Sequence, residues 1–390
     1  MTTTVSRTLP WALIGAACLG SFAATSAGTT RAPFLLEIAR DLGVSMPLVA
    51  NLVSLTSISW GITSALGGWL SDLIGRRILL VAAPLALGLS IAMQAISGSF
   101  FDLAVWATIS GACSGTFMGV IFAEVSAHVE DRQRGRALGW VMSGQSLTLV
   151  IGVPMAAAVG ALIGWRGWLF CVGGLAFAGC LALFLTVKPT ERALPGTPKV
   201  SMRGALSPRV LGLLGTGVAE RVCYGLAAVY YATFLQVTYH LSLAALALPL
   251  AVFAIGNVVG TILGGQLADR LRDRLLTFAV AMVASGGAAL ALFLWHPNPE
   301  TSVVLGFIYV LLNALGRPSL ISSYAAVPDS VRGTVMGLSG TAASLGWVGA
   351  AALGGVMIGT VGFEGFGPLG ALLGLLGAAG ALLCRRTAVA

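Results

Sequence analysis

Long apolar stretches alternate with short polar ones along this chain. Asp, Glu, Lys and Arg are all absent from many long stretches, among them 42–71, 78–101, 103–123, 137–165, 167–187, 222–268, 275–299, 333–363 and 365–384. A helix that spans a membrane needs roughly 20 mostly apolar residues. The stretch 222–268 is too long for one such helix, so we place a break near Gln236–Ser242, where Gln, Thr, His and Ser cluster.

This pattern predicts an all-α membrane protein with twelve transmembrane helices. The apolar N-terminal stretch is too long for a signal peptide, and eleven further spans follow it. We expect the spans, with ends uncertain by several residues, at 11–36, 46–70, 78–98, 102–127, 135–161, 167–187, 209–236, 243–268, 275–295, 301–326, 333–358 and 365–384.

Composition agrees with this pattern. Of the 390 residues, 57% are hydrophobic and only 9% are charged. An ordinary soluble domain carries roughly 25% charged residues, so this chain cannot form a water-facing surface of the usual kind. The 52 glycines are also more than soluble helices tolerate, whereas transmembrane helices use Gly for close packing.

The formal net charge of +8 reflects topology. Most of the 22 basic residues fall on one side of the predicted topology, while Arg40 and Arg166 lie in loops on the other side. The positive-inside rule then places both termini in the cytoplasm, and we expect an integral protein of a bacterial inner membrane. The charge therefore does not indicate a nucleic-acid partner.

The two halves of the chain repeat one another. The run from Gly68 to Asp72 returns 197 positions later as the run from Gly265 to Asp269, and basic residues follow both copies. Small residues recur at every fourth position upstream of both runs, which lets helix backbones approach closely. We therefore predict two pseudo-symmetric six-helix bundles, 1–187 and 209–390, joined by a cytoplasmic linker at 188–208. Transporters of this design move their two bundles around a site at mid-membrane.

These motifs resemble those of the major facilitator superfamily over essentially the whole chain. The run Gly68-Trp-Leu-Ser-Asp72-Leu-Ile-Gly75-Arg76-Arg77 is similar to the family's signature loop between helices 2 and 3. The Gly/Pro-rich segment around Gly152 and Pro154, and the run from Trp165 to Phe170, resemble the drug–proton antiporter or arabinose-efflux-like branch. That branch carries an Arg in helix 4 where this chain has Ala107, so the proton-coupling role of that Arg is not transferred.

The resemblance implies a set of residues that control conformational change. Asp72 would hold one side of the transporter closed by facing the positive end of a neighbouring helix. The alternative is a solvated turn that only sets topology. The residues expected to act in gating are Gly68, Asp72, Gly75, Arg76, Arg77, Gly265, Asp269, Arg270, Gly152 and Pro154.

Ionisable residues inside spans are the candidates for the transport site. Because a charge in the membrane interior is costly, it faces a cavity or a partner. Glu220 falls near the middle of its span, and Tyr224 and Tyr231 share its helical face. It is the leading candidate for proton binding; the alternative is a static ion pair with Arg317 or Arg221. The complete set for proton or substrate binding is Glu220, Arg317, Arg221, Arg31, Tyr224, Tyr231 and Asn313.

The function predicted from these features is secondary active transport by alternating access. We expect proton-coupled efflux of small amphiphilic or drug-like molecules, with no cofactor besides the coupling proton and no metal site. The alternative is a carrier of organic anions that uses the embedded Arg residues. We see no sequence pattern of an enzyme, and we expect a monomer whose partners are a small-molecule substrate and the lipid bilayer. Substrate identity, direction and proton coupling stay open.

Overall fold

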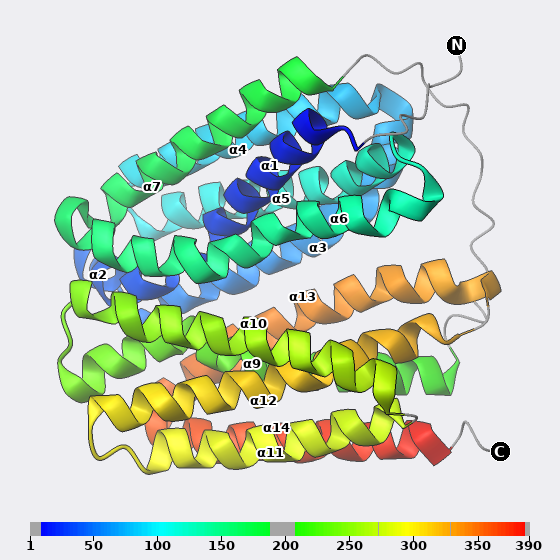
Figure 1. Ribbon diagram of the computed structural model, residues 1–390. Coiled ribbons are helices and arrows are strands. Elements are labelled where there is room, and N and C mark those ends of the chain that lie inside the picture. Colours follow the sequence, from blue (N-terminus) through cyan, green and yellow to red (C-terminus); the bar gives the residue numbers. More distant parts are fainter. Residues whose placement is uncertain (1–8, 188–206, 272, 328, 387–390) are drawn as a thin grey trace. The chain divides into compact units, whose positions relative to one another are not determined.

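The computed structural model describes residues 9–187, 207–271, 273–327 and 329–386, and all regular structure in these ranges is helical. Figure 1 shows the helices with the labels used below. Their bounds are α1 Trp11–Thr29, η1 Ala32–Phe34, α2 Leu35–Asp41, α3 Met46–Ile74, α4 Arg76–Ile96, α5 Phe100–Ala127, α6 Asp131–Leu147, η2 Thr148–Gly152, α7 Val153–Thr186, α9 Pro208–Tyr239, η3 Ala244–Leu246, α10 Ala247–Arg270, α11 Arg274–Leu294, α12 Pro299–Ala325, α13 Asp329–Thr360, η4 Phe363–Gly365 and α14 Phe366–Arg386.

Polar side chains set the starts of several helices. The backbone N–H groups of the first turn lack partners inside the helix, and a side-chain oxygen just before it can accept from one of them. Ser99 does so for α5, Ser207 for α9 and Asn298 for α12. Asp273 caps α11 in the same way and also pairs with Arg385 near the end of α14 at 2.6 Å. These four polar side chains thus define the starts of α5, α9, α11 and α12.

Eleven helical segments among the described residues are long and apolar enough to cross a membrane. The longest, Gln133–Thr186, has 54 residues, more than twice the roughly 20 that one crossing needs. Inside it, Gly164 has φ 70° and ψ 171°, which is not helical. This break lies between the spans predicted at 135–161 and 167–187, while the expected total of twelve stays a prediction.

The break expected within 222–268 is present. Helix α9 ends at Tyr239, His240 adopts a left-handed conformation with φ 54°, and η3 begins at Ala244. The first span differs from the prediction of one continuous helix at 11–36, because α1 ends at Thr29. A 3-10 turn at Ala32–Phe34 follows before α2 begins. Pro33 accounts for the end of α1 at Thr29, because it has no N–H group to donate to the carbonyl of Thr29 four residues before it.

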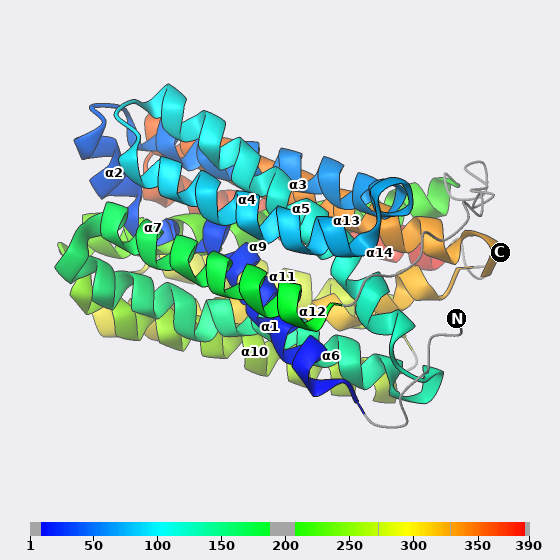
Figure 2. The same cartoon turned by 90° about the horizontal axis from the view of Figure 1, so that it is seen from above.

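The described helices form two compact units. One contains Met1–Ser45 and Leu55–Thr197, and the other contains Met46–Ser54 and Pro198–Ala390. The start of α3 thus groups with the second unit, and residues 188–206 of the expected linker lie outside the described residues. In the first unit α4 packs against α5 and α7 (Figure 2). In the second, α11 packs correspondingly against α12 and α14 (Figure 1).

Glycines allow the closest helix packing in each unit. In the second unit, a Cβ atom on Gly260 or Gly264 of α10 would overlap backbone atoms of α12 at Leu311 or Leu315. In the first unit the glycines are on the partner helix, because Gly111 and Gly115 of α5 lie against α3. Small residues at every fourth position therefore bring the backbones together, as the sequence pattern indicated.

Candidate functional site

A cluster of ionisable side chains lies inside the second unit, centred on Glu220 of α9. Glu220 is the thirteenth residue of a 32-residue helix, so it lies about 18 Å along a helix of about 48 Å. Its side chain is 2% exposed. A buried carboxylate needs charged or hydrogen-bonding partners, and the neighbouring helix α12 supplies one.

Arg317 of α12 is that partner. Its Nε and Nη2 atoms both donate to Oε1 of Glu220, at 3.2 and 3.0 Å. The other carboxylate oxygen, Oε2, lies 3.4 Å from Nη2 of Arg221. Pro318 follows Arg317 inside α12, and because Pro has no N–H group, the carbonyl of Ala314 loses its usual helical donor. One carboxylate therefore serves two guanidinium groups beside a weakened helical turn.

Tyr224 covers this charge cluster one turn along α9. The guanidinium carbons of Arg317 and Arg221 lie 4.9 and 5.6 Å from the centre of its ring. Its edge also meets Trp347 of α13, with ring centres 5.6 Å apart. The face of an aromatic ring attracts cations, so Tyr224 stabilises both guanidinium groups that contact Glu220.

Two other tyrosines fix the backbone of α9 around Glu220. Tyr309 of α12 donates to the carbonyl of Cys223, and Tyr324 donates to the carbonyl of Leu213 at 3.1 Å. Asn313, one turn before Arg317, is fully buried, and its amide has no hydrogen-bond partner among the described residues. The expected residues Glu220, Arg317, Arg221 and Tyr224 thus make direct contact, with Asn313 on the adjacent turn of α12.

Tyr231 takes part in a different cluster. Its hydroxyl donates to the carbonyl of Ser302 at 3.0 Å, and its ring stacks on Phe253 with centres 5.1 Å apart. Phe234 is also adjacent, at 6.4 Å. Tyr231 therefore belongs to an aromatic cluster farther along α9. It shares a helical face with Glu220 but does not contact the carboxylate.

An apolar groove of about 470 Å³ lies elsewhere in the second unit. Helices α9, α13 and α14 line it, with Gly215, Val222, Leu353 and Leu376 among the lining residues and none of the charged cluster. Among the described residues no group of His, Cys, Asp and Glu is arranged to hold a metal ion. The groove and the charged cluster around Glu220 are therefore separate features of the second unit.

Arg31 lies in the first unit, at the break between α1 and α2. It is 4% exposed, and its Nε donates to the carbonyl of Ala27 at 3.0 Å. Its Nη1 and Nη2 atoms are buried and have no hydrogen-bond partner among the described residues. The side chain therefore stays inside the unit and does not extend to its surface.

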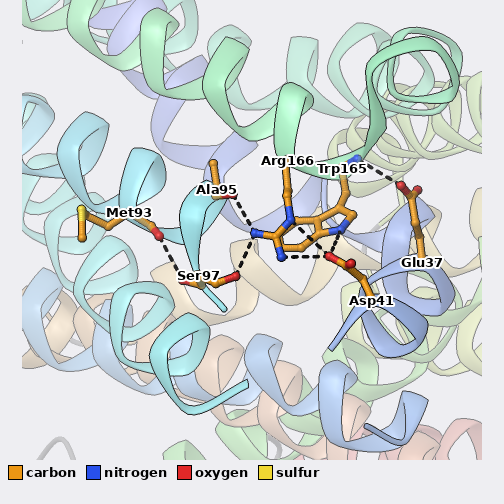
Figure 3. A network of polar contacts seen from close by, with 7 residues as sticks. All are labelled: Glu37, Asp41, Met93, Ala95, Ser97, Trp165 and Arg166. Carbon is orange, nitrogen blue, oxygen red and sulfur yellow. Dashed lines mark hydrogen bonds and ion pairs between the residues drawn. The ribbon is translucent and has the colours of Figure 1, made fainter. Parts of the chain in front are cut away.

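A polar network near this break joins α2, α4 and α7 (Figure 3). Arg166 donates to Asp41 at 2.9 and 3.1 Å, and to the carbonyls of Ala95 and Ser97 at 2.8 Å each. The ring N–H of Trp165 also donates to Asp41, at 3.1 Å, while its backbone N–H donates to Glu37 at 3.3 Å. Arg166 thus connects three helix ends.

The signature loop is described only in part. The side chains of Trp69 and Asp72 are outside the described part of the structure, and so is the burial of Gly68. Gly75 ends α3 with φ 95°, a conformation that favours glycine. Arg76 lies 3.9 Å from Glu124, and Arg77 lies over the ring of Phe184 at 5.5 Å.

The second copy of the signature loop and the Gly/Pro-rich segment around Gly152 both lie where one helix ends. Asp269 and Arg270 are exposed at the end of α10, and a Cβ on Gly265 would meet nothing within 4 Å. Gly152 ends the π-helix η2, and Pro154 lies in the first turn of α7. Because π-helical turns are found most often at functional sites, η2 marks this segment as unusual.

The sequence did not single out three of the residues that make these contacts. Asp41 and Glu37 sit at the end of a span, where acidic residues are ordinary. Trp168, whose ring N–H donates to Thr30 at 2.9 Å, was noted only as part of a motif. The described ionic partners of Glu124, a buried acid of α5, are His128 at 3.6 Å and Arg76 at 3.9 Å. For Glu37 and Asp41, the available signal in the sequence was a negative charge beside a largely apolar segment.

Known proteins share this sequence pattern. The chain is 27% identical over 311 residues to the chloramphenicol resistance protein of Streptomyces lividans, covering 76% of this chain and 79% of that one. It is 33% identical over 154 residues to a chloramphenicol efflux pump of Mycobacterium tuberculosis, covering 39% and 37%. For several curated relatives, the chain spans less than two thirds of the relative's length.

Solved structures share the fold. A bacterial homologue of the human lysosomal transporter Spinster, in an inward-facing and occupied conformation, matches with a TM-score of 0.76 over 98% of both chains at 17% identity. The sequence family described as Major Facilitator Superfamily matches residues 17–230 and 213–389 of this chain. Together these two ranges include nearly the whole sequence. The chain, a membrane transporter with relatives that are named as efflux pumps, belongs to the Major Facilitator Superfamily.

Proposed function

We propose that this protein is a proton-coupled exporter of small amphiphilic molecules, with Glu220 as the proton-binding residue. The observation that carries the proposal is the buried carboxylate of Glu220, which lies 3.0 Å from Arg317. It occurs in a chain that belongs to a family of transporters. Relatives named for chloramphenicol resistance and efflux support export of an uncharged, partly apolar substrate. The family-typical Arg of helix 4 is absent at Ala107, so coupling has to use other residues.

In this proposal, a proton and Arg317 compete for the Oε1 atom of Glu220, and this competition couples proton binding to transport. Arg317 occupies Oε1 of Glu220 with two hydrogen bonds. A proton on that oxygen would replace both bonds, because a protonated carboxyl group no longer carries the charge that attracts the guanidinium. Arg317 would then rest against Tyr224 and the weakened turn at Pro318. Proton binding and the arrangement of α9 against α12 are therefore linked.

The same proposal includes the orientation of the protein in the membrane, the type of membrane and the oligomeric state. The excess of basic residues on one side supports cytoplasmic termini in a bacterial inner membrane. The signature-loop residues would control closure on that side, and the protein would work as a monomer. The second unit contains a complete Glu–Arg cluster of its own, so no second copy is needed for the site.

Transport in proteoliposomes tests this proposal. Glu220→Gln keeps the shape of the side chain and one acceptor but cannot exchange a proton. We expect it to lose uphill transport driven by a pH gradient and to keep exchange between equal substrate pools. A static ion pair predicts that exchange and folding yield fall together. The control Glu300→Gln removes an exposed carboxylate at the start of α12 and should behave as the wild type.

Full pH-driven accumulation by Glu220→Gln would end the proton role. Transport of an organic anion is the second candidate, because two guanidinium groups surround one carboxylate in the cluster. Arg317→Gln separates the two functions: an anion carrier loses substrate binding, whereas an exporter of neutral or cationic molecules keeps most of it.

A further inference from the structure

Arg31 differs from the other two basic residues within spans. Arg317 and Arg221 both lie beside Glu220, at 3.0 and 3.4 Å. Arg31 uses only Nε, toward the carbonyl of Ala27, and both of its Nη atoms are buried without a partner among the described residues. A buried charge without a counterion is strongly unfavourable, so this arrangement calls for an anion.

The acidic residues nearest in sequence are already engaged. Glu37 accepts from the backbone N–H of Trp165 at 3.3 Å. Asp41 accepts from Arg166 at 2.9 and 3.1 Å, and from the ring of Trp165. The network in Figure 3 therefore uses both carboxylates of α2 and does not include Arg31.

The backbone around Arg31 is held in place from both sides. The hydroxyl of Thr30 donates to the carbonyl of Ser26 at 2.7 Å and accepts from Trp168 of α7 at 2.9 Å. On the other side, Pro33 and Phe34 are buried in the turn η1. Broken transmembrane helices with fixed ends are used by transporters to bind ions and charged substrate groups. The backbone that carries Arg31 is thus held in position, and its Nε is tied to the carbonyl of Ala27.

The chemistry of the free atoms defines the ligand class. The two Nη atoms form one edge of a planar guanidinium, which matches the two oxygens of a carboxylate or phosphate. Phe34 and Leu35, which follow Arg31 in the sequence, are buried and apolar. We infer that Arg31 is an anion-binding residue of the first unit, which takes the carboxylate or phosphate group of an amphiphilic molecule. This site is separate from Glu220 and goes beyond the proton role proposed for that residue.

Thermal unfolding of the purified full chain, with no pH gradient, tests the site. Benzoate is the probe, benzamide is its neutral counterpart, and inorganic phosphate distinguishes a free anion from an organic one, with chloride keeping the ionic strength constant. We expect benzoate to raise the unfolding temperature of the wild type in a saturable way, and benzamide to have no such effect. Arg31→Gln should weaken the apparent affinity for benzoate about tenfold or more, because a charge-assisted pair is lost.

Arg40→Gln is the matched control, since it removes an exposed Arg from the adjacent helix α2. It should respond to benzoate as the wild type does. Arg31→Lys keeps the charge without the planar edge and should bind benzoate more weakly than the wild type; it decides the outcome if Arg31→Gln does not fold.

The inference is overturned if neither benzoate nor phosphate stabilises the wild type saturably. It is also overturned if Arg31→Gln, or Arg31→Lys in its place, responds as strongly as the wild type. A phosphate effect larger than that of benzoate keeps the anion site and identifies a free inorganic anion as its ligand. None of these outcomes depends on Glu220, so the anion site and the proton site stand or fall separately.

Discussion

Arg317 directs two nitrogens at a single oxygen of Glu220, at 3.2 and 3.0 Å. Arg221 has only one contact with the other oxygen, at 3.4 Å. The two guanidinium groups are therefore not equivalent, although the sequence offered both as partners. The shorter, doubled contact joins α9 to α12, whereas the longer one joins neighbours on the same helix.

This difference predicts unequal effects on stability. Removing one partner of a buried ion pair costs about 3–5 kcal/mol in soluble proteins. We expect Arg317→Gln to cost an amount near the lower end of that range, because Glu220 keeps Arg221, and Arg221→Gln to cost clearly less. Chemical unfolding of the purified variants in detergent measures both values. Equal losses would show that Glu220 does not distinguish its two partners.

The signature loop gives a prediction about kinetics. Asp72→Asn should slow transport while leaving expression and substrate affinity nearly intact, because Asp72 ends a helix next to the Gly75 turn and is far along α3 from any mid-membrane position. Transport rate and equilibrium binding are measured side by side. Glu300→Gln, which removes an exposed carboxylate outside the signature loop and its second copy, is the control. An equal loss of binding by Asp72→Asn would argue against gating.

The network around Arg166 predicts a stability effect in the first unit. Arg166→Gln loses the ion pair with Asp41 and the bonds to the carbonyls of Ala95 and Ser97. The ion pair is partly exposed, so its share is small. Hydrogen bonds to a charged group contribute about 1.5–3 kcal/mol each, and we expect a total loss of about 2 kcal/mol or more. Unfolding temperature reports it, and Arg40→Gln should leave it unchanged.

Two adjacent glycines offer a matched pair of substitutions. A Cβ on Gly264 would overlap the backbone of Leu315, whereas a Cβ on Gly265 would meet nothing within 4 Å. Gly264→Ala should therefore destabilise the protein by about 1–3 kcal/mol through overpacking. Gly265→Ala should be neutral or stabilising by up to about 1 kcal/mol, since Ala favours the helix. Comparison of their unfolding temperatures checks this; similar values would contradict the close approach of α10 to α12.

Apolar periodicity and charge predicted much of this structure. The charge-free stretches located the helices, and the polar cluster around His240 located the end of α9. Because a lone carboxylate in a membrane is unfavourable, the sequence offered Arg317 or Arg221 as a partner for Glu220, and both lie beside it in the structure.

Other features depend on packing that a pattern of residues does not contain. Helical spacing placed Tyr231 on the face of Glu220, but the stacking partner Phe253 and the acceptor at Ser302 hold it elsewhere. Pro33 is visible in the sequence beside Arg31, yet the length of the break and the contact of Trp168 with Thr30 depend on the neighbouring helix α7. Asp41 resembled an ordinary residue at a helix end because its partner Arg166 is 125 positions away.

The π-helical turn at Thr148–Gly152 sets the rotational register of the helical residues between it and the break at Gly164. One π turn accommodates a residue more than an α turn does, and each residue of an α-helix rotates the chain by about 100°. If the same residues formed regular α-helix, the segment 153–163 would therefore be rotated by about 100°. Gly160, which packs against Phe34 of η1, would then face elsewhere, so the wide turn determines which side of α7 meets the break between α1 and α2.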